Sequence, residues 1–236
     1  AVASYIGAFL SKGGCDVTLI DMWGLHVDAI KKDGLRASGT QGDFTVPVRA
    51  LHITESQAIN HSFDTVFLAV KSYDTEWATH FIKRFLSPNG IIISAQNCMN
   101  DEIIASIAGY NRTIGCVMSG ITVALWEPGH VSRGGKPGNQ RGHDVFRVGE
   151  LHGRITNRIN SLAKLLHCID AAKTTTNIWG ERWSKLTTNA SSNPVTAMSG
   201  MGSSSAANYP NARWIQTHIT REAVLVGQAL GYNIEP

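Results

Sequence analysis

Short apolar runs alternate with amphipathic segments over the first 110 residues of the chain. Apolar, β-branched runs at Asp16–Ile20, Thr65–Val70 and Gly90–Ala95 predict strands, and the last two are apolar enough to be covered on both faces. Helical spacing of apolar residues predicts helices at Val2–Ser11, His26–Lys32, Tyr73–Leu86 and Asp101–Ala108. Strands and helices that alternate in this way are typical of a parallel, doubly wound α/β sheet.

The pattern changes in the second half of the chain. A Gly- and Thr-rich segment at Leu35–Ile53 predicts a hairpin, and a Gly-rich loop, Gly134–Gly142, lies among further extended segments. From Ile155 onward the predicted elements are helices, at Ile155–Cys168, Ile178–Met198 and Asn211–Leu230. We therefore expect a Rossmann-type α/β domain at residues 1–172, followed by an all-helical domain at residues 173–236.

The start of the sequence matches the later parts of a dinucleotide-binding unit. Such a unit runs from a first strand through a glycine-rich turn to a helix, and its second strand ends in an acidic residue. Ala3 stands where the third small residue of the turn would lie, and Asp21 follows about 18 residues later, near the usual offset. The first strand and the first two glycines are absent from the sequence. The alternative is an ordinary amphipathic helix, with Asp21 capping the turn before the next helix.

Two polar residues follow consecutive predicted strands. Lys71 comes directly after Thr65–Val70, and Asn97 comes shortly after Gly90–Ala95. Ligands of doubly wound sheets bind at the carboxyl ends of the strands, where these side chains could hydrogen-bond a ribose, a phosphate or a carboxamide. Each residue alone is a common surface residue, but their positions at two successive strand ends favour a cofactor site.

A second group of polar residues recurs along the predicted helix Ile178–Met198. Lys185, Asn189 and Asn193 are four positions apart, so they drift by only about 80° around the helix and share one face. A lysine can protonate a carbonyl oxygen that receives hydride, and asparagine can orient a substrate without adding charge. The alternative is a solvated polar stripe. Pro194 predicts a bend or break in the helix.

Several strings of the sequence together resemble one protein family. WSKLTTNASSNPVTAMSG (Trp183–Gly200) is similar to the signature of the ketopantoate reductase family. Three further strings match the same family in register, namely LAVKSYDT at Leu68–Thr75, SAQNCMN at Ser94–Asn100 and EPGHVSRGG at Glu127–Gly135. The resemblance therefore extends over almost the whole chain.

The resemblance implies a fold, an activity and roles for individual residues. It implies an N-terminal Rossmann domain and a C-terminal helical domain, with the active site in the cleft between them. It implies NADPH-dependent reduction of 2-dehydropantoate to pantoate in pantothenate biosynthesis. By position, Lys185 would protonate the ketone oxygen, Asn189 and Asn193 would bind the substrate, and Lys71 and Asn97 would lie beside the cofactor.

The sequence also departs from the family pattern. Cys98 stands where the family has glycine, and its thiol would crowd the nicotinamide end or mark a different subgroup. The resemblance favours NADP(H), whereas Asp21 favours the free ribose diol of NAD(H), and neither Arg36 nor Lys31 can be placed against a 2′-phosphate. The late Ser and Glu substrate contacts of the family would lie beyond Pro236, so the resemblance implies a sequence cut at both ends.

Composition and charge exclude several classes of protein. Lys and Arg number 21 against 18 Asp and Glu, and this balance of +3 gives no support to a nucleic-acid-coating surface. Apolar runs such as Val66–Val70 are far too short to span a bilayer. The four cysteines are widely separated and predict reduced, mostly buried thiols, and the nine histidines lack metal-binding spacing, so no metal is expected.

These observations lead to one leading hypothesis and three alternatives, the last of which is a truncated, inactive fragment. The leading hypothesis is a cytoplasmic reductase of a small 2-oxo acid, with Lys185 as the general acid and a homodimer left open. A family member that reduces a different 2-oxo acid is the first alternative. The second is a dinucleotide-binding module that binds the cofactor and transfers no hydride.

Overall fold

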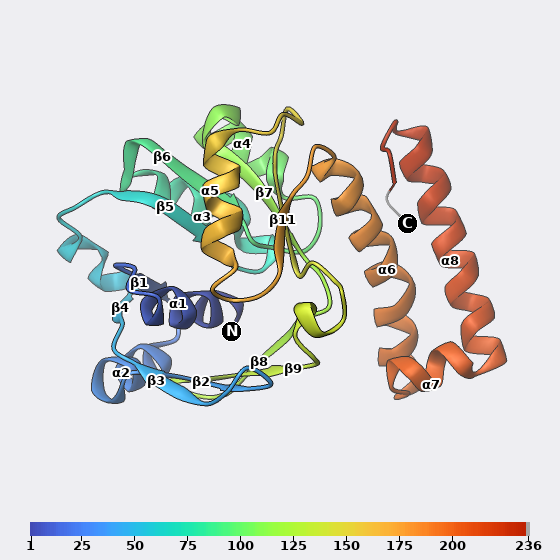
Figure 1. Cartoon of the computed structure of the whole chain (residues 1–236), viewed down its shortest axis with the longest axis horizontal. Helices are drawn as coiled ribbons and strands as arrows, with labels where there is room; N and C mark the ends of the chain where they lie inside the picture. The colour runs from blue at the N-terminus through green and yellow to red at the C-terminus, as the bar shows by residue number, and fades with distance from the viewer. Residues whose placement is uncertain (235–236) are drawn as a thin grey trace.

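The computed structural model describes residues 1–234, and it divides into an α/β part and a helical part that lie side by side (Figure 1). The helices are α1 (Val2–Lys12), α2 (Gly24–Asp33), α3 (Thr75–Lys83), α4 (Asp101–Ala108), α5 (Asn157–Leu166), α6 (Ile178–Ser199), α7 (Ser203–Asn208) and α8 (Pro210–Ala229). The strands are β1 (Thr18–Asp21), β2 (Leu35–Gly39), β3 (Phe44–Val46), β4 (Arg49–His52), β5 (Phe63–Leu68), β6 (Leu86–Ser94), β7 (Thr113–Met118), β8 (Thr122–Glu127), β9 (His130–Gly134), β10 (Phe146–Glu150) and β11 (Ala172–Thr174). Short 3₁₀ turns lie at Ile53–Ala58, Ser72–Asp74, Tyr110–Arg112 and Gly138–Gln140.

The largest sheet has the strand order β11-β10-β7-β6-β5. Strands β5, β6 and β7 are parallel, with α3 and α4 as their crossover helices, and β10 is antiparallel to β7. A separate parallel pair, β1 and β4, completes the α/β part together with a four-stranded sheet in the order β3-β2-β9-β8. The Rossmann-type prediction is confirmed, and β10 and β11, which are parallel to each other, run antiparallel to the other three strands of the sheet.

The predicted hairpin at Leu35–Ile53 is shorter than expected. Strands β2 and β3 form an antiparallel pair in which Leu35 lies opposite Val46. Pro47 follows directly and has no backbone N–H to continue the ladder, so the hairpin ends there. The remainder of the segment forms β4, which pairs in parallel with β1 instead.

Burial of the two predicted central strands differs. In β6, Ile92 and Ile93 are completely buried, as predicted for a strand covered on both faces. In β5, Asp64 and Thr65 are exposed, so the prediction of complete cover is wrong for the first half of this strand. The physical reason is that β5 is the last strand of the five-stranded sheet and pairs only with β6.

Helix α1 packs closely against the strand that follows it. A Cβ atom added at Gly7 would lie 2.8 Å from the end of the Leu19 side chain in β1, so a larger residue at this position would require Leu19 to shift. On its other sides α1 buries Tyr5, Ile6 and Ala8 in the main core, and it also contacts β2, β3, β8 and β9. The start of α1 is thereby fixed relative to the ends of the neighbouring strands.

Helices α6, α7 and α8 form the helical part (Figure 1). Trp183 of α6 stacks on Tyr232 at a ring distance of 5.0 Å and donates a hydrogen bond of 2.8 Å to the carbonyl of Ala223 in α8. A Cβ atom at Gly227 would lie 2.1 Å from the Trp183 indole, so the two helices meet closely at this point. The result is a V-shaped helical arrangement with a small core of its own, Val195, Ala206 and Ala212.

The predicted helix break at Pro194 does not occur. Helix α6 passes through Pro194 and ends only at Ser199. A proline removes a single N–H from the helical ladder, and Val195, which follows it, is buried against Ala206 and Ala212. Tertiary packing therefore holds this turn helical.

The sequence also gave expectations about membrane-spanning helices, metal sites and cysteines. No helix of residues 1–234 is long and apolar enough to cross a membrane. The same residues contain no group of three or more His, Cys, Asp and Glu side chains placed to hold a metal ion. All four cysteines are free, but Cys98 and Cys168 are exposed, so the prediction of mostly buried thiols is wrong for these two. Burial raises the pKa of the Cys116 thiol to about 12.

Candidate active site

The candidate cofactor residues gather at one edge of the α/β part. Asp21 ends β1, Lys71 lies three residues after β5, and Ala3 lies in the first turn of α1. Asp21 and Lys71 both act electrostatically on the first residue of the described chain, directly before α1. Both charges therefore lie close to the start of α1. A carboxylate, an ammonium and the amide groups of a helix N-terminus are groups that can bind the ribose and phosphates of a dinucleotide.

Asp21 has a structural contact as well. One carboxylate oxygen, Oδ1, accepts a hydrogen bond of 2.9 Å from the backbone N–H of Trp23, the residue before α2. The contact agrees with the alternative in which Asp21 caps the turn before the next helix, but it engages one oxygen and leaves the carboxylate half-buried at the strand end. Lys31 and Arg36 are paired elsewhere, with Glu55 and Asp43 respectively.

Hydrogen bonds between two loops fix the positions of Lys71 and Asn97. The Gln96 amide donates to the carbonyl of Val70 and to the hydroxyl of Thr75, at 2.8 and 2.9 Å. The Asn100 amide donates to Ser72 Oγ and to the carbonyl of Asn97, at 3.0 and 2.8 Å. Asn100 is the N-cap residue of α4, but its side chain makes no cap hydrogen bond and joins the loops instead. The carboxyl ends of β5 and β6 therefore form one rigid edge.

Cys98 has an unusual backbone conformation. Its φ angle is +70°, and no other non-glycine residue of the part that the structure describes has a positive φ. A residue that carries a side chain is strained in this left-handed region, whereas glycine is not. The positive φ angle explains why glycine would suit this position, as the family pattern has it. The Cys98 thiol is exposed, and the residue keeps this conformation at the cost of backbone strain.

A buried ion pair attaches α6 to this edge. The Arg182 guanidinium lies 2.7 Å from the Asp101 carboxylate, measured from Nε to Oδ2, and donates from Nη2 to Asp101 Oδ1 at 2.9 Å and to the carbonyl of Ser94 at 2.7 Å. It also donates to the carbonyl of Gln96. Sequence reasoning missed Arg182, although it lies only three residues before Lys185.

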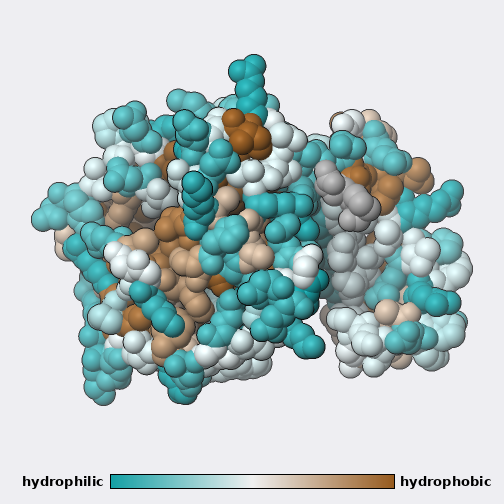
Figure 2. Space-filling view, viewed as in Figure 1, coloured by the Kyte–Doolittle hydropathy of each residue, from teal (hydrophilic) through white to brown (hydrophobic). Residues whose placement is uncertain are grey.

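Two hollows meet at Lys185. The smaller, of about 90 Å³, is lined by Val2 at the start of α1, by Asn97 and by Lys185. The larger, of about 690 Å³, has Lys185 and Arg147 in its wall and extends between the end of β7 and helices α6 and α8. Figure 2 shows a largely hydrophilic groove between the α/β part and the helical part. Lys185 is therefore the side chain shared by a cofactor-side hollow and a larger cavity.

The environment of Lys185 suits proton donation. The pKa of its ammonium is lowered, mainly by burial and further by the nearby Arg147 guanidinium. A general acid works best when its pKa lies near the working pH, and a free lysine is too weak an acid for this. Burial beside a second cation thus makes Lys185 a better proton donor.

The linings of the two hollows do not include the two asparagines of α6. Asn189 is half-buried and Asn193 is exposed, and neither belongs to the lining of either hollow. The α6 residues that line the larger cavity with Lys185 are Glu181, Ser184, Thr187 and Thr188. The α6 face toward the cavity is therefore displaced from the stripe that four-residue spacing predicts.

Residues that sequence reasoning did not select complete the larger cavity. Arg141, His143 and Arg147 reach it from the Gly-rich segment and β10. Arg147 forms an ion pair of 3.2 Å with Glu181 and donates to Ser119 Oγ at 3.2 Å. The sequence could not predict that these residues meet. Residues in an irregular, Gly-rich loop follow no helical or strand periodicity, so their spacing does not show that they face the same cavity.

Fold and site together define a Rossmann-type α/β protein with a helical C-terminal part and a polar cavity between the two. Residues 1–151 match the family described as ketopantoate reductase PanE/ApbA, and residues 177–236 match its C-terminal domain. The chain belongs to the ketopantoate reductase family, a family of oxidoreductases.

Individual relatives agree with this assignment. The chain is 27% identical to the 2-dehydropantoate 2-reductase of Archaeoglobus fulgidus, over 100% of this chain and 74% of that protein. It is 25% identical to the enzyme of the same name from Halobacterium salinarum, over 99% and 74%. A putative ketopantoate reductase from Ralstonia solanacearum MolK2 has a similar structure, with a TM-score of 0.85, 25% identity and coverage of 100% and 76%. The fold is also that of a D-mandelate dehydrogenase solved with NADH and anilino(oxo)acetate, with a TM-score of 0.86, 19% identity and coverage of 100% and 73%.

Proposed function

We propose that the protein reduces a 2-oxo acid with a reduced nicotinamide dinucleotide and that Lys185 is the general acid. The observation that carries the proposal is the position of Lys185, which lines both the hollow beside Asn97 and the larger polar cavity. A cofactor bound at the edge of Asp21, Lys71 and Asn97 would supply hydride to the carbonyl carbon. The membership of the chain in a family of 2-oxo acid reductases supports the same reaction.

Each residue has a defined task in this proposal. Lys185 transfers a proton from Nζ to the ketone oxygen, and its lowered pKa favours the transfer. Asn97 and Lys71 hold the cofactor, fixed by the hydrogen bonds of Gln96 and Asn100. Asn189 and Asn193 remain proposed substrate contacts by their positions in the family pattern.

For the cofactor we propose NAD(H) in preference to NADP(H). A carboxylate at the end of the second Rossmann strand binds the free ribose diol and repels a 2′-phosphate. Asp21 has this position, and the nearby cations Lys31 and Arg36 are already paired with Glu55 and Asp43. The family resemblance supports NADP(H) as the alternative.

We propose 2-dehydropantoate as the first substrate to be assayed, because curated relatives carry that name. The alternatives are another 2-oxo acid and a module that binds the cofactor without turnover. The nucleotide-binding part is proposed to extend through β11, Ala172–Thr174, two residues beyond the boundary that the sequence predicts, because β11 pairs with β10. The cytoplasmic location and the homodimer stay predictions.

The test is a Lys185→Met variant, assayed by loss of the reduced nicotinamide absorbance with a panel of 2-oxo acids. We expect kcat to fall about 10²–10⁴-fold while cofactor binding is retained. Lys164→Met, at an exposed position of α5, is the matched control and should leave kcat unchanged. Wild-type turnover by Lys185→Met would exclude Lys185 as the acid, and cofactor binding without turnover by the wild type would favour the non-catalytic alternative.

A further inference from the structure

The larger cavity beside Lys185 has an excess of positive charge. In the described part of the chain, the cavity lining includes two arginines and one lysine, Arg141, Arg147 and Lys185. The same lining includes one acidic residue, Glu181. The pKa of His143 in the same wall is lowered by burial and by the Arg147 and Arg141 guanidinium groups, which favours its neutral form. The cavity therefore has a net charge of about +2 when Lys185 is protonated.

We propose that this cavity binds a 2-oxo acid with a second acidic group, in the simplest case a 2-oxo dicarboxylate. Arg147, beside Lys185, binds the carboxylate next to the ketone, and Arg141 binds the distal carboxylate. The inference rests on the proposed function and specifies its substrate class. A dianion balances the charge of the cavity, whereas a 2-oxo acid with a neutral tail leaves one guanidinium without an ionic partner.

Contacts hold Arg147 in a fixed orientation next to the proposed acid. Its Nε lies 3.2 Å from Glu181 Oε2, and its Nη1 donates to Ser119 Oγ at 3.2 Å. These contacts leave further guanidinium N–H groups for a ligand, since arginine has five donors. Arg147 and Lys185 both line the larger cavity, so one substrate bound there can contact both cations.

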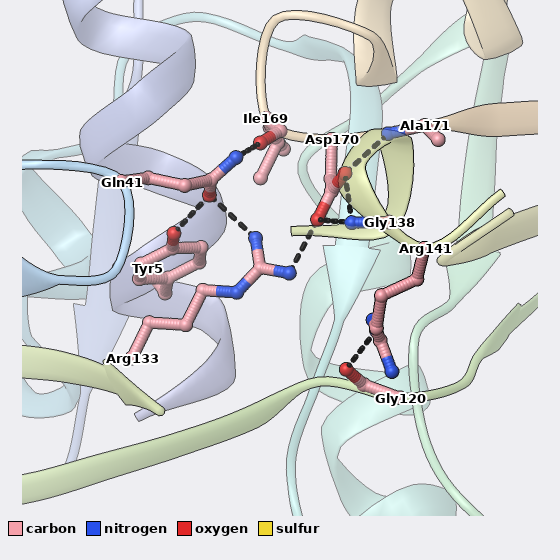
Figure 3. Close-up of polar contacts among 9 residues, drawn as sticks. All are labelled: Tyr5, Gln41, Gly120, Arg133, Gly138, Arg141, Ile169, Asp170 and Ala171. Carbon is pink, nitrogen blue, oxygen red and sulfur yellow. Dashed lines mark hydrogen bonds and ion pairs between the residues drawn. The ribbon is translucent and has the colours of Figure 1, made fainter. Parts of the chain in front are cut away.

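A buried network holds the segment that carries Arg141 (Figure 3). The Asp170 carboxylate accepts hydrogen bonds of 2.9 and 3.1 Å from the backbone N–H of Gly138, and it pairs with the fully buried Arg133. Arg133 in turn donates to Gln41, which also accepts a hydrogen bond of 2.5 Å from the hydroxyl of Tyr5.

The backbone of the segment is equally constrained. A Cβ atom at Gly138 would lie 2.2 Å from the carbonyl oxygen of His143, so the turn closes tightly at this glycine. Arg141 itself donates from Nη2 to the carbonyl of Gly120 at 2.7 Å, as Figure 3 shows. Because the turn is already ordered, Arg141 can bind an anion with little loss of loop entropy.

The remaining lining combines hydroxyl side chains with the apolar Val224 and Ile234, and the cavity has a suitable size. About 690 Å³ lies within the range of small-molecule sites. Hydroxyl side chains dominate the lining beside the charged residues, at Ser119, Ser184, Thr187, Thr188 and Thr220.

The test compares two five-carbon substrates, 2-oxoglutarate and 2-oxopentanoate, which differ in the distal carboxylate. We expect kcat/KM of the purified protein to be at least about tenfold higher for 2-oxoglutarate, as one charge-assisted contact predicts. Arg141→Met should remove most of this preference, because it lowers kcat/KM for 2-oxoglutarate about tenfold more than kcat/KM for 2-oxopentanoate. Arg141→Lys, which keeps the charge, should retain the preference, and so should the control Arg154→Met at an exposed site in the loop before α5.

Different failures have different meanings. Equal use of the two substrates, or an equal loss for both in Arg141→Met, would overturn the dianion inference. If 2-oxopentanoate or 2-dehydropantoate is reduced and 2-oxoglutarate is not, the proposed function stands and only this inference fails. If the wild type reduces no 2-oxo acid, the proposed function fails and the inference fails with it.

Discussion

Arg182 of α6 and Asp101 of α4 form an ion pair of 2.7 Å in which the side chains are only 3% and 1% exposed. The same guanidinium donates to the carbonyls of Ser94 and Gln96, at the end of β6. The helix that carries Lys185 is thus attached directly to the loop that carries Asn97. The distance between the proposed proton donor and the proposed cofactor contact depends on this pair.

Replacement of Arg182 by methionine should destabilise the protein strongly. The Asp101 carboxylate would remain buried without its partner, and loss of one member of a buried ion pair costs about 3–5 kcal/mol. Urea unfolding measures the change. The double variant Arg182→Met/Asp101→Leu should recover most of the loss, because no charge is then left buried. A single variant as stable as the wild type would show that the pair does not hold the two parts together.

The pH dependence of turnover should report the charge of Arg147. Lys185 donates its proton only when protonated, so reduction is active below the pKa of Lys185 and is lost as the pH rises through it. Burial and Arg147 lower that pKa. Arg147→Met removes the second cause, so the high-pH limb of kcat should move to higher pH. Arg154→Met should leave the limb in place, and a limb that does not move in Arg147→Met would contradict the assignment.

The charge of Asp21 should decide between the two cofactors. Asp21→Asn keeps the acceptor for the Trp23 N–H and removes the charge that repels a 2′-phosphate. We expect the ratio of kcat/KM for NADPH to that for NADH to rise about tenfold. Asp16→Asn, at an exposed position before β1, should not change the ratio. An unchanged ratio in Asp21→Asn would leave Asp21 with its capping role alone.

Glycine at position 98 should stabilise the fold. The left-handed conformation costs a residue with a side chain about 1–2 kcal/mol, and the greater freedom of unfolded glycine offsets about 0.5–1 kcal/mol of the gain. Cys98→Gly should therefore raise the free energy of unfolding by up to about 1.5 kcal/mol. Cys168→Gly is the matched control, because Cys168 is also exposed but has no positive φ, and it should give no gain. A loss in both variants would argue against strain at Cys98.

Much of the α/β part could be predicted from hydrophobic spacing. The predicted helices at Val2–Ser11 and Asp101–Ala108 agree with α1 and α4 to within one residue at each end. Spacing could not show that Arg49–His52 leaves the predicted hairpin to pair with β1, because strand partners depend on contacts between distant segments. For the same reason α6 continues through Pro194, where packing of Val195 outweighs the local preference of proline.

Periodicity and a contiguous motif are local properties of the chain, so hydrophobic spacing and the string Trp183–Gly200 were enough to predict the α/β order, the family and Lys185 as the candidate acid. Tertiary structure decided which side chains surround Lys185. Arg141 and Arg147 lie about 40 residues away along the chain and share a cavity with it, and Asn189 and Asn193 lie outside that cavity although they share its helix. A helical stripe fixes only which residues share one face, whereas the direction of that face is fixed by Trp183 against α8 and by Arg182 against Asp101.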